Sequence, residues 1–178
     1  MKRLLLLLVV LLAMPAIAIA DESTPRYFFR ECDFVALVND ARADAGLPAV
    51  TINYDLTQAA DHHAYDMART GWYKADHTLS DGTTARQNIV NHGYPLRPPF
   101  TYQPGFTPYY GEIMTAGPWS AESAFRAFWY SPSHKAIILN PKMKAIGVSR
   151  AQGWPSVRYP WYWVATFGGV TGTVWKAC

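Results

Sequence analysis

The chain has 178 residues, of which 50% are hydrophobic and 15% aromatic, and it carries 16 Lys and Arg against 13 Asp and Glu. This apolar content excludes an intrinsically disordered protein, and the length favours a single domain. The net charge of +3 is too small for a protein that binds nucleic acid through its overall field.

Residues 1–20 predict a cleaved secretory signal peptide. Lys2 and Arg3 precede an apolar run, and small residues lead to a cleavage position after Ala20. A retained membrane anchor is the alternative, although the purely apolar run is short for a bilayer span. Cleavage would leave a nearly neutral chain with no further membrane span, and it predicts a secreted, periplasmic or extracellular location.

The two cysteines both lie after the predicted cleavage position. Only one intramolecular pairing is available to them, and an exported protein meets an oxidising compartment. A disulfide between Cys32 and Cys178 is therefore expected, and two free thiols are the alternative.

The first half of the mature chain shows helical periodicity. Asp33 is expected to cap a first helix that ends at Gly46, and a second helix should run from about Asp55 to Gly71. A third and shorter helix is predicted for residues 84–91.

Residues 94–111 contain five prolines, which exclude regular structure, interleaved with aromatic residues. A long loop in a compact domain is often functional, so the wider segment 100–119 is a candidate for ligand or partner contact. The alternative is a packed loop that seals the domain. The candidate contact residues are Phe100, Tyr102, Phe106, Tyr109 and Tyr110.

A fourth helix should begin after Ser120 and end at Pro132. Residues 145–149 and 161–167 are rich in β-forming residues, and the short connection between them favours an antiparallel pair. Helices therefore come first and sheet last, which is typical of the α+β class.

Three residues are candidates for a joint site. His77 and His134 lie where a helix gives way to a loop, a common position for functional side chains. Glu112 lies between a glycine and apolar residues, so its carboxylate should be partly buried and in need of a partner such as an imidazole.

The other histidines favour structural interpretations. His63 lies on the apolar stripe of the second helix and is expected to be buried, whereas His62 should face solvent. His92 lies at a helix end, where it can interact with the last carbonyl groups. Ser149 is expected in a strand, not in a nucleophile elbow.

A series of short motifs over residues 33–168 resembles the CAP superfamily of cysteine-rich secretory proteins, antigen 5 and pathogenesis-related 1 proteins, and its shorter bacterial branch in particular. Residues 21–32 would form a lead-in and residues 33–178 the CAP domain. The motifs include Asn39-Asp40-Ala41-Arg42, Ala45-Gly46-Leu47-Pro48, Gly111-Glu112, Ser131-Pro132-Ser133-His134 and Leu139-Asn140-Pro141.

The resemblance implies an α-β-α sandwich with a small three-stranded antiparallel sheet between helical layers. It also implies a central cleft lined by two histidines and two acids, which carry over onto His77, His134 and, for the first acid, Glu112. In the family the histidines can hold a divalent ion such as zinc, so His77 and His134 are the expected metal ligands.

This sequence departs from the family pattern at the cleft. The asparagine that follows the family's glutamate is replaced by Ile113, and the second acid falls on Ser131. Glu122, two turns earlier on the fourth helix, is a candidate substitute. Ser133 replaces a glycine.

The resemblance implies a secreted binding module for a lipid, a sterol or an extracellular protein, since most members of the family have no established catalytic activity. The alternative is a metal-dependent hydrolase that cleaves peptides or esters, with Glu112 as the base. The fold alone does not decide between these classes, because function belongs to the site.

Overall fold

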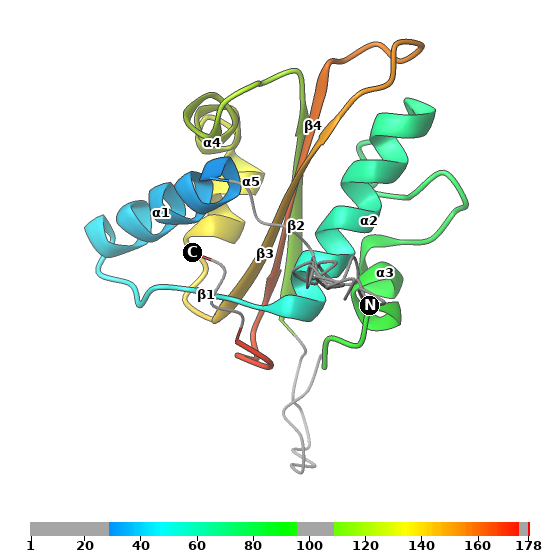
Figure 1. Ribbon diagram of the computed structural model, residues 1–178. Coiled ribbons are helices and arrows are strands. Elements are labelled where there is room, and N and C mark those ends of the chain that lie inside the picture. The colour runs from blue at the N-terminus through cyan, green and yellow to red at the C-terminus, as the bar shows by residue number, and fades with distance from the viewer. Residues whose placement is uncertain (1–28, 96–108, 175–177) are drawn as a thin grey trace, which may run out of the picture.

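The computed structural model describes residues 29–95, 109–174 and 178 (Figure 1). The predicted signal peptide, most of the predicted lead-in, and the contact candidates Phe100, Tyr102 and Phe106 lie outside these residues. Among the helices of the described ranges, none is long and apolar enough to cross a membrane.

The described elements form three layers, with a sheet between two groups of helices, as expected (Figure 1). One face of the sheet is covered by α1 (Phe29–Asp44), α4 (Ala121–Trp129) and α5 (Pro132–Ile138). The other face is covered by α2 (Tyr54–Thr70), with α3 (Ala85–Asn91) packed against α2. The predicted α-β-α sandwich is therefore confirmed.

The sheet has the strand order β1-β3-β4-β2. The long strands β2 (Tyr110–Ala116), β3 (Ala145–Gln152) and β4 (Trp161–Gly168) are antiparallel, and this is the predicted three-stranded sheet. A two-residue strand, β1 (Thr51–Ile52), adds a parallel edge against the start of β3. Residue periodicity did not predict β2, because the prolines before it pointed to a loop.

Two helix boundaries differ from those expected. The first helix already includes Phe29, so Asp33 lies inside it and is not its cap. Pro132 follows the end of α4 at Trp129, as expected, and it also begins an additional helix, α5. A proline is favoured at the first helical position because its missing N–H would have no partner there.

Helix α2 has defined ends that fix its position over the sheet. The side chain of Asn53 accepts a hydrogen bond from the backbone N–H of Leu56, and Gly71 ends the helix with a φ of 72°. The left-handed conformation of Gly71 is the usual way to end a helix, as the sequence predicted. Between these ends, one face of α2 is buried and includes His63.

Two apolar layers hold the sandwich together. On the α1 side, Phe34 packs edge-on against Phe128 at 5.7 Å and lies near Trp163. On the α2 side, small residues such as Ala60 and Ala64 allow the helix to approach the sheet closely.

The closest approach of α2 to the sheet occurs at Gly147 of β3. A Cβ atom at Gly147 would lie 2.1 Å from the carbonyl carbon of Leu56 and 2.2 Å from the backbone nitrogen of Thr57. We therefore expect Gly147→Ala to lower the free energy of unfolding by about 3 kcal/mol, because α2 must move away from the sheet. Denaturant unfolding of the variant measures this loss.

The matched control for this substitution is Gly46→Ala. Gly46 has a φ of 69° and no atom within 4 Å of the added Cβ, so only the backbone conformation opposes alanine. The expected cost is about 1–2 kcal/mol. Equal losses at positions 46 and 147 would contradict tight helix–sheet packing at Gly147.

The ends of the described chain are tied to the body of the fold. The predicted disulfide between Cys32 and Cys178 is present and joins positions 146 residues apart. Close by in the sequence, the buried Arg42 donates hydrogen bonds to the carbonyl oxygens of Pro48, Ile138, Asn140 and Met143. Arg42 thereby links α1 to the connection between α5 and β3.

Candidate functional site

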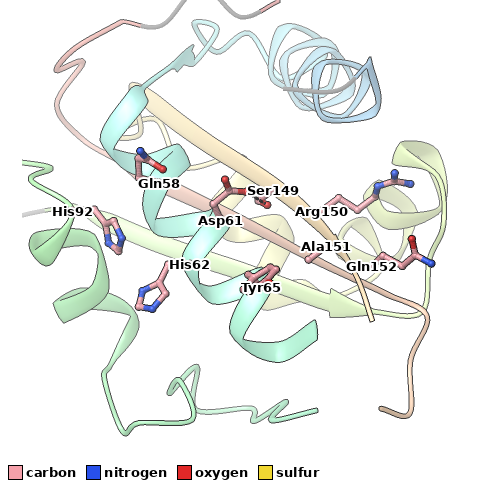
Figure 2. A pocket seen from close by; sticks show the side chains of 9 residues that line it. All are labelled: Gln58, Asp61, His62, Tyr65, His92, Ser149, Arg150, Ala151 and Gln152. Atoms are coloured by element: carbon pink, nitrogen blue, oxygen red, sulfur yellow. Dashed lines mark hydrogen bonds between the residues drawn. The ribbon is translucent and has the colours of Figure 1, made fainter. Parts of the chain in front are cut away.

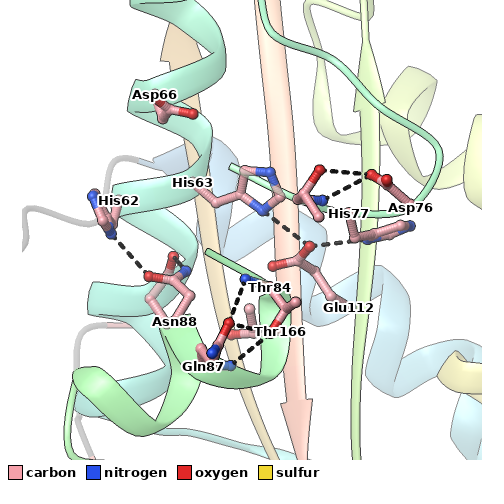
Figure 3. Close-up of polar contacts among 12 residues, drawn as sticks. His62, His63, Asp66, Asp76, His77, Thr84, Gln87, Asn88, Glu112 and Thr166 are labelled. Carbon is pink, nitrogen blue, oxygen red and sulfur yellow. Dashed lines mark hydrogen bonds and ion pairs between the residues drawn. The ribbon is translucent and has the colours of Figure 1, made fainter. Parts of the chain in front are cut away.

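The candidate site contains four titratable side chains from separate parts of the fold, and three of them, His63, His77 and Glu112, meet on the α2 side of β2 (Figure 3). His63 comes from the buried face of α2, and His77 from the turn that follows α2. Glu112 comes from β2 and His134 from α5. The sequence predicted three of these residues as a joint site, and the fold brings those three together.

Glu112 is the centre of this group. Its side chain is only 2% exposed, and its Oε1 lies 3.0 Å from His63 Nδ1 and 2.9 Å from His77 Nδ1. Burial by itself would raise the pKa of Glu112, but the two imidazoles outweigh burial and hold the pKa below its ordinary value. Glu112 is therefore an ionised, weakly basic carboxylate at neutral pH.

His77 is held in a fixed orientation. An ionised carboxylate only accepts hydrogen bonds, so His77 donates its Nδ1 proton to Glu112, and in the neutral ring Nε2 keeps its lone pair. The backbone of His77 has a φ of 60°, in the left-handed region that residues other than glycine adopt uncommonly. Such a conformation is consistent with a position maintained for a functional side chain.

His134 lies next to His77 but does not contact Glu112. The two imidazole centroids are 6.4 Å apart, and the His134 ring packs edge-on against Phe128 at 5.3 Å. Burial, and then the neighbouring His77, lowers the pKa of His134 below its ordinary value of 6.5. His134 is therefore a neutral imidazole at pH 7.

A cavity of about 370 Å³ opens beside this group. His77, whose side chain is 23% exposed, and Glu112, whose side chain is 2% exposed, both contribute to the cavity wall. The wall exposes both polar and apolar surface, and it consists of Asp76, His77, Thr84, Ala85, Arg86, Tyr110 and Glu112.

Two of the predicted cleft residues have other environments. Glu122 is exposed in the first turn of α4, where its charge interacts with Arg30, so it does not replace the missing second acid. Ser131 occupies the position that caps α5, but its hydroxyl group makes no capping hydrogen bond and instead lies 3.2 Å from that of Ser133.

The contact candidates Tyr109 and Tyr110 differ from each other. Tyr109 packs against the apolar core and has the ammonium group of Lys142 5.1 Å from its ring centroid, so it fits the alternative of a sealing residue. Tyr110 is 38% exposed and lines the cavity beside His77, as expected of a contact residue.

Sequence reasoning missed His63 and Arg86 as members of this site. His63 was interpreted as a buried structural histidine, and burial is correct, but its Nδ1 also faces Glu112. The buried face of α2 contains one imidazole among mainly apolar side chains, and this was the available signal. Nothing local distinguished Arg86.

The side chains of this site are of the types that bind divalent ions, but the distance between His77 and His134 is longer than a shared ion requires. His77 donates its Nδ1 proton to a carboxylate, as metal-binding histidines commonly do. However, two imidazoles on one tetrahedral ion, with metal–nitrogen bonds of about 2.0 Å, have centroids about 5 Å apart. The centroids of His77 and His134 are 6.4 Å apart, so one of the two rings must move inward for both to bind one ion. Within the described ranges, no group of three or more His, Cys, Asp or Glu side chains is arranged to hold a metal.

The fold is similar to that of solved bacterial proteins. An extracellular protein containing a SCP domain from Bacillus anthracis matches 79% of this chain with a TM-score of 0.63 and 16% identity. An outer surface protein from Borrelia burgdorferi matches 82% of this chain and 97% of its own, with a TM-score of 0.61 and 22% identity. A cysteine-rich secretory protein from Staphylococcus aureus matches 84% of this chain, with a TM-score of 0.56 and 17% identity.

The chain spans 40% of the length of the Bacillus protein and 40% of the Staphylococcus protein. At these identities the structural matches show a shared fold. No curated protein sequence matches the chain. Comparison with protein families matches residues 35–167 to the cysteine-rich secretory protein family. Because this match extends over most of the sequence, from the first helix to the last strand, the chain belongs to the cysteine-rich secretory protein (CAP) family.

Proposed function

We propose that this CAP domain is an exported, extracellular binding module whose ligand enters the cavity beside His77. The observation that carries the proposal is the geometry of Glu112. A carboxylate that is 2% exposed fixes the Nδ1 side of an imidazole that is 23% exposed, so the other edge of His77 is presented to the cavity in one orientation. Preorganisation of this kind reduces the cost of binding.

The same geometry argues against the alternative of a hydrolase. A general base works best when its pKa lies near the working pH, and the two imidazoles shift the pKa of Glu112 in the opposite direction. Among the described residues, no hydroxyl or thiol group is hydrogen-bonded to His77 or His134, so no side-chain nucleophile is activated there.

The cavity lining indicates which part of a ligand it accepts. Arg86, Thr84, His77 and Tyr110 are polar, and a cavity of about 370 Å³ is small. The polar groups can orient the head group of a lipid or a polar side chain of an extracellular protein, and the small volume disfavours a wholly buried sterol.

A divalent ion at this site is part of the proposal. His77 Nε2 and His134 would hold it after one of the two rings moves inward, with Glu112 orienting His77 through its Nδ1 atom. A bound ion would supply a Lewis acid that attracts anionic or carbonyl groups of the ligand. Arg86, on the cavity wall, would contribute positive charge whether or not the ion is present.

The test is native mass spectrometry of the protein isolated from its own secretion medium. We expect an N-terminus at Asp21, a bound ligand, and loss of that ligand in His77→Asn, because asparagine tolerates the left-handed backbone but cannot fill the place of the imidazole. Glu122→Gln is the control and should retain the ligand. Equal ligand occupancy in wild type and His77→Asn would refute the proposed site, and turnover of peptide or ester libraries that His77→Asn abolishes would establish the hydrolase instead.

A further inference from the structure

A second pair of histidines lies outside the site around Glu112. His62, on α2, and His92, at the C-terminal cap of α3, have ring centroids 5.2 Å apart. Neighbouring residues of a helix point about 100° apart, so His62 faces away from the direction of His63. Both rings border a groove of about 600 Å³ between α2 and β3 (Figure 2). Its other lining residues are Gln58, Asp61, Tyr65, Ser149, Arg150, Ala151 and Gln152.

Both imidazoles are held by a single buried residue, Asn88. The side-chain amide of Asn88 donates from Nδ2 to the carbonyl oxygen of Ala59, so its Oδ1 is the atom that faces His62 Nδ1, 2.8 Å away (Figure 3). The backbone carbonyl oxygen of Asn88 lies 2.8 Å from His92 Nδ1. Asn88 thus presents one acceptor to each ring.

These contacts determine where the protons are. A carbonyl oxygen can only accept a hydrogen bond, so both Nδ1 atoms carry a proton, and in the neutral rings both Nε2 atoms keep their lone pairs. Neither Nε2 atom is hydrogen-bonded to another described residue. Donation of the second ring N–H to a carbonyl group is the arrangement that metal-binding histidines commonly show.

The distance between the rings agrees with shared coordination. Two imidazoles on one tetrahedral ion, with metal–nitrogen bonds of about 2.0–2.1 Å, have centroids about 5 Å apart. The pair His62 and His92 is separated by 5.2 Å, whereas His77 and His134 are separated by 6.4 Å.

The electrostatic environment also favours a cation. Asp55 lies within electrostatic range of His92, and Asp81 within range of His62. Asp61 lines the groove itself, where its carboxylate accepts a hydrogen bond from Ser149. These three carboxylates place negative charge near the two imidazoles.

We infer that His62 Nε2 and His92 Nε2 form a second metal site, which binds a divalent transition-metal ion such as Zn²⁺ at the edge of the groove. With two protein ligands, the ion keeps open positions for water or for a donor group of a molecule in the groove. The inference does not depend on the function proposed for the cavity beside His77.

The test is a calorimetric titration of the disulfide-bonded, tag-free chain with ZnCl₂. Wild type should bind Zn²⁺, and His62→Gln or His92→Gln should each weaken one binding event more than about 10-fold, which is the least expected from loss of a ligand. The double variant with His77→Gln and His134→Gln is the matched control and should retain that event. His62 is exposed and His92 half-buried, so both single variants should keep the circular dichroism spectrum of the wild type.

A second measurement follows the imidazole nitrogens by NMR. Zn²⁺ should shift the Nε2 resonances of His62 and His92 and leave both Nδ1 atoms protonated. Three results would overturn the inference: no Zn²⁺ binding by the wild type, unchanged binding by His62→Gln and His92→Gln, or loss of all binding in the double variant at positions 77 and 134. Only the last of these results would place the ion in the proposed cleft.

Discussion

Replacing Cys32 and Cys178 together by alanine should lower the free energy of unfolding by up to about 5 kcal/mol. The disulfide closes a loop of 146 residues, so its removal frees nearly the whole described chain in the unfolded state. Loop-closure entropy grows with the logarithm of loop length, and a loop of this size approaches the upper limit of what one disulfide contributes. Denaturant unfolding of the wild type and the double variant measures the difference.

Reduction provides the control for this experiment. A thiol reductant should lower the stability of the wild type towards that of the double variant and should leave the double variant unchanged. Cys178 is exposed, so the reductant can reach the bond without global unfolding. A difference below about 1 kcal/mol between the two proteins would mean that the packing of α1 holds the chain ends without the covalent link.

Glu112→Gln should lower the free energy of unfolding by about 2–3 kcal/mol at neutral pH. Glutamine keeps the shape of the side chain but removes the charge that interacts with His63 and His77. Hydrogen bonds to charged groups contribute about 1.5–3 kcal/mol, and the buried environment of Glu112 allows little compensation by water. Denaturant unfolding at pH 7 measures the loss.

The matched control is Glu122→Gln, an identical change of an exposed glutamate in the first turn of α4. Its effect should stay within about 0.5 kcal/mol, as for surface substitutions in general. If Glu112→Gln and Glu122→Gln lower the free energy of unfolding by the same amount, the contacts of Glu112 with the two imidazoles do not stabilise the fold.

The effect of Glu112→Gln should also depend on pH. The pKa of Glu112 is lower in the folded than in the unfolded protein, so the carboxylate contributes stability above its ordinary pKa of 4.5 and loses it as pH falls through the folded value. The stability difference between wild type and variant should therefore be largest near neutral pH and should shrink below about pH 4.5. A difference that is constant from pH 7 to pH 3 would contradict the depressed pKa.

Predictions from the sequence succeeded where the signal was local. The residues that end α2 and begin α4, Gly71 and Ser120, act through hydrogen bonds and backbone conformations within one helical turn. The strands that begin at Ala145 and Trp161 contain enough β-forming residues to be recognised alone. Strand β2 was missed because its residues become a strand mainly by pairing with β4, about fifty positions later in the sequence.

The candidate site shows the same division. His77, Glu112 and His134 were chosen for their residue types and their positions beside loops, and the motif series that they share with CAP proteins reinforced the choice. The prediction that Glu122 replaces the second acid of the family was wrong. Helical spacing alone does not reveal that Glu122 faces Arg30 and solvent. His63 was assigned only a structural role, because its partner lies on another element.

By itself, the sequence determined the family, the three-layer architecture, the pairing of the two cysteines and three of the four side chains of the candidate site, one of which is Glu112. These follow from short motifs, from periodicity and from the single way in which two cysteines can pair within one chain. Only the tertiary structure decided which imidazoles share a partner. Glu112 joins His63 and His77, and Asn88 holds His62 and His92, because α2 packs between the sheet and α3 and directs adjacent histidines to different neighbours.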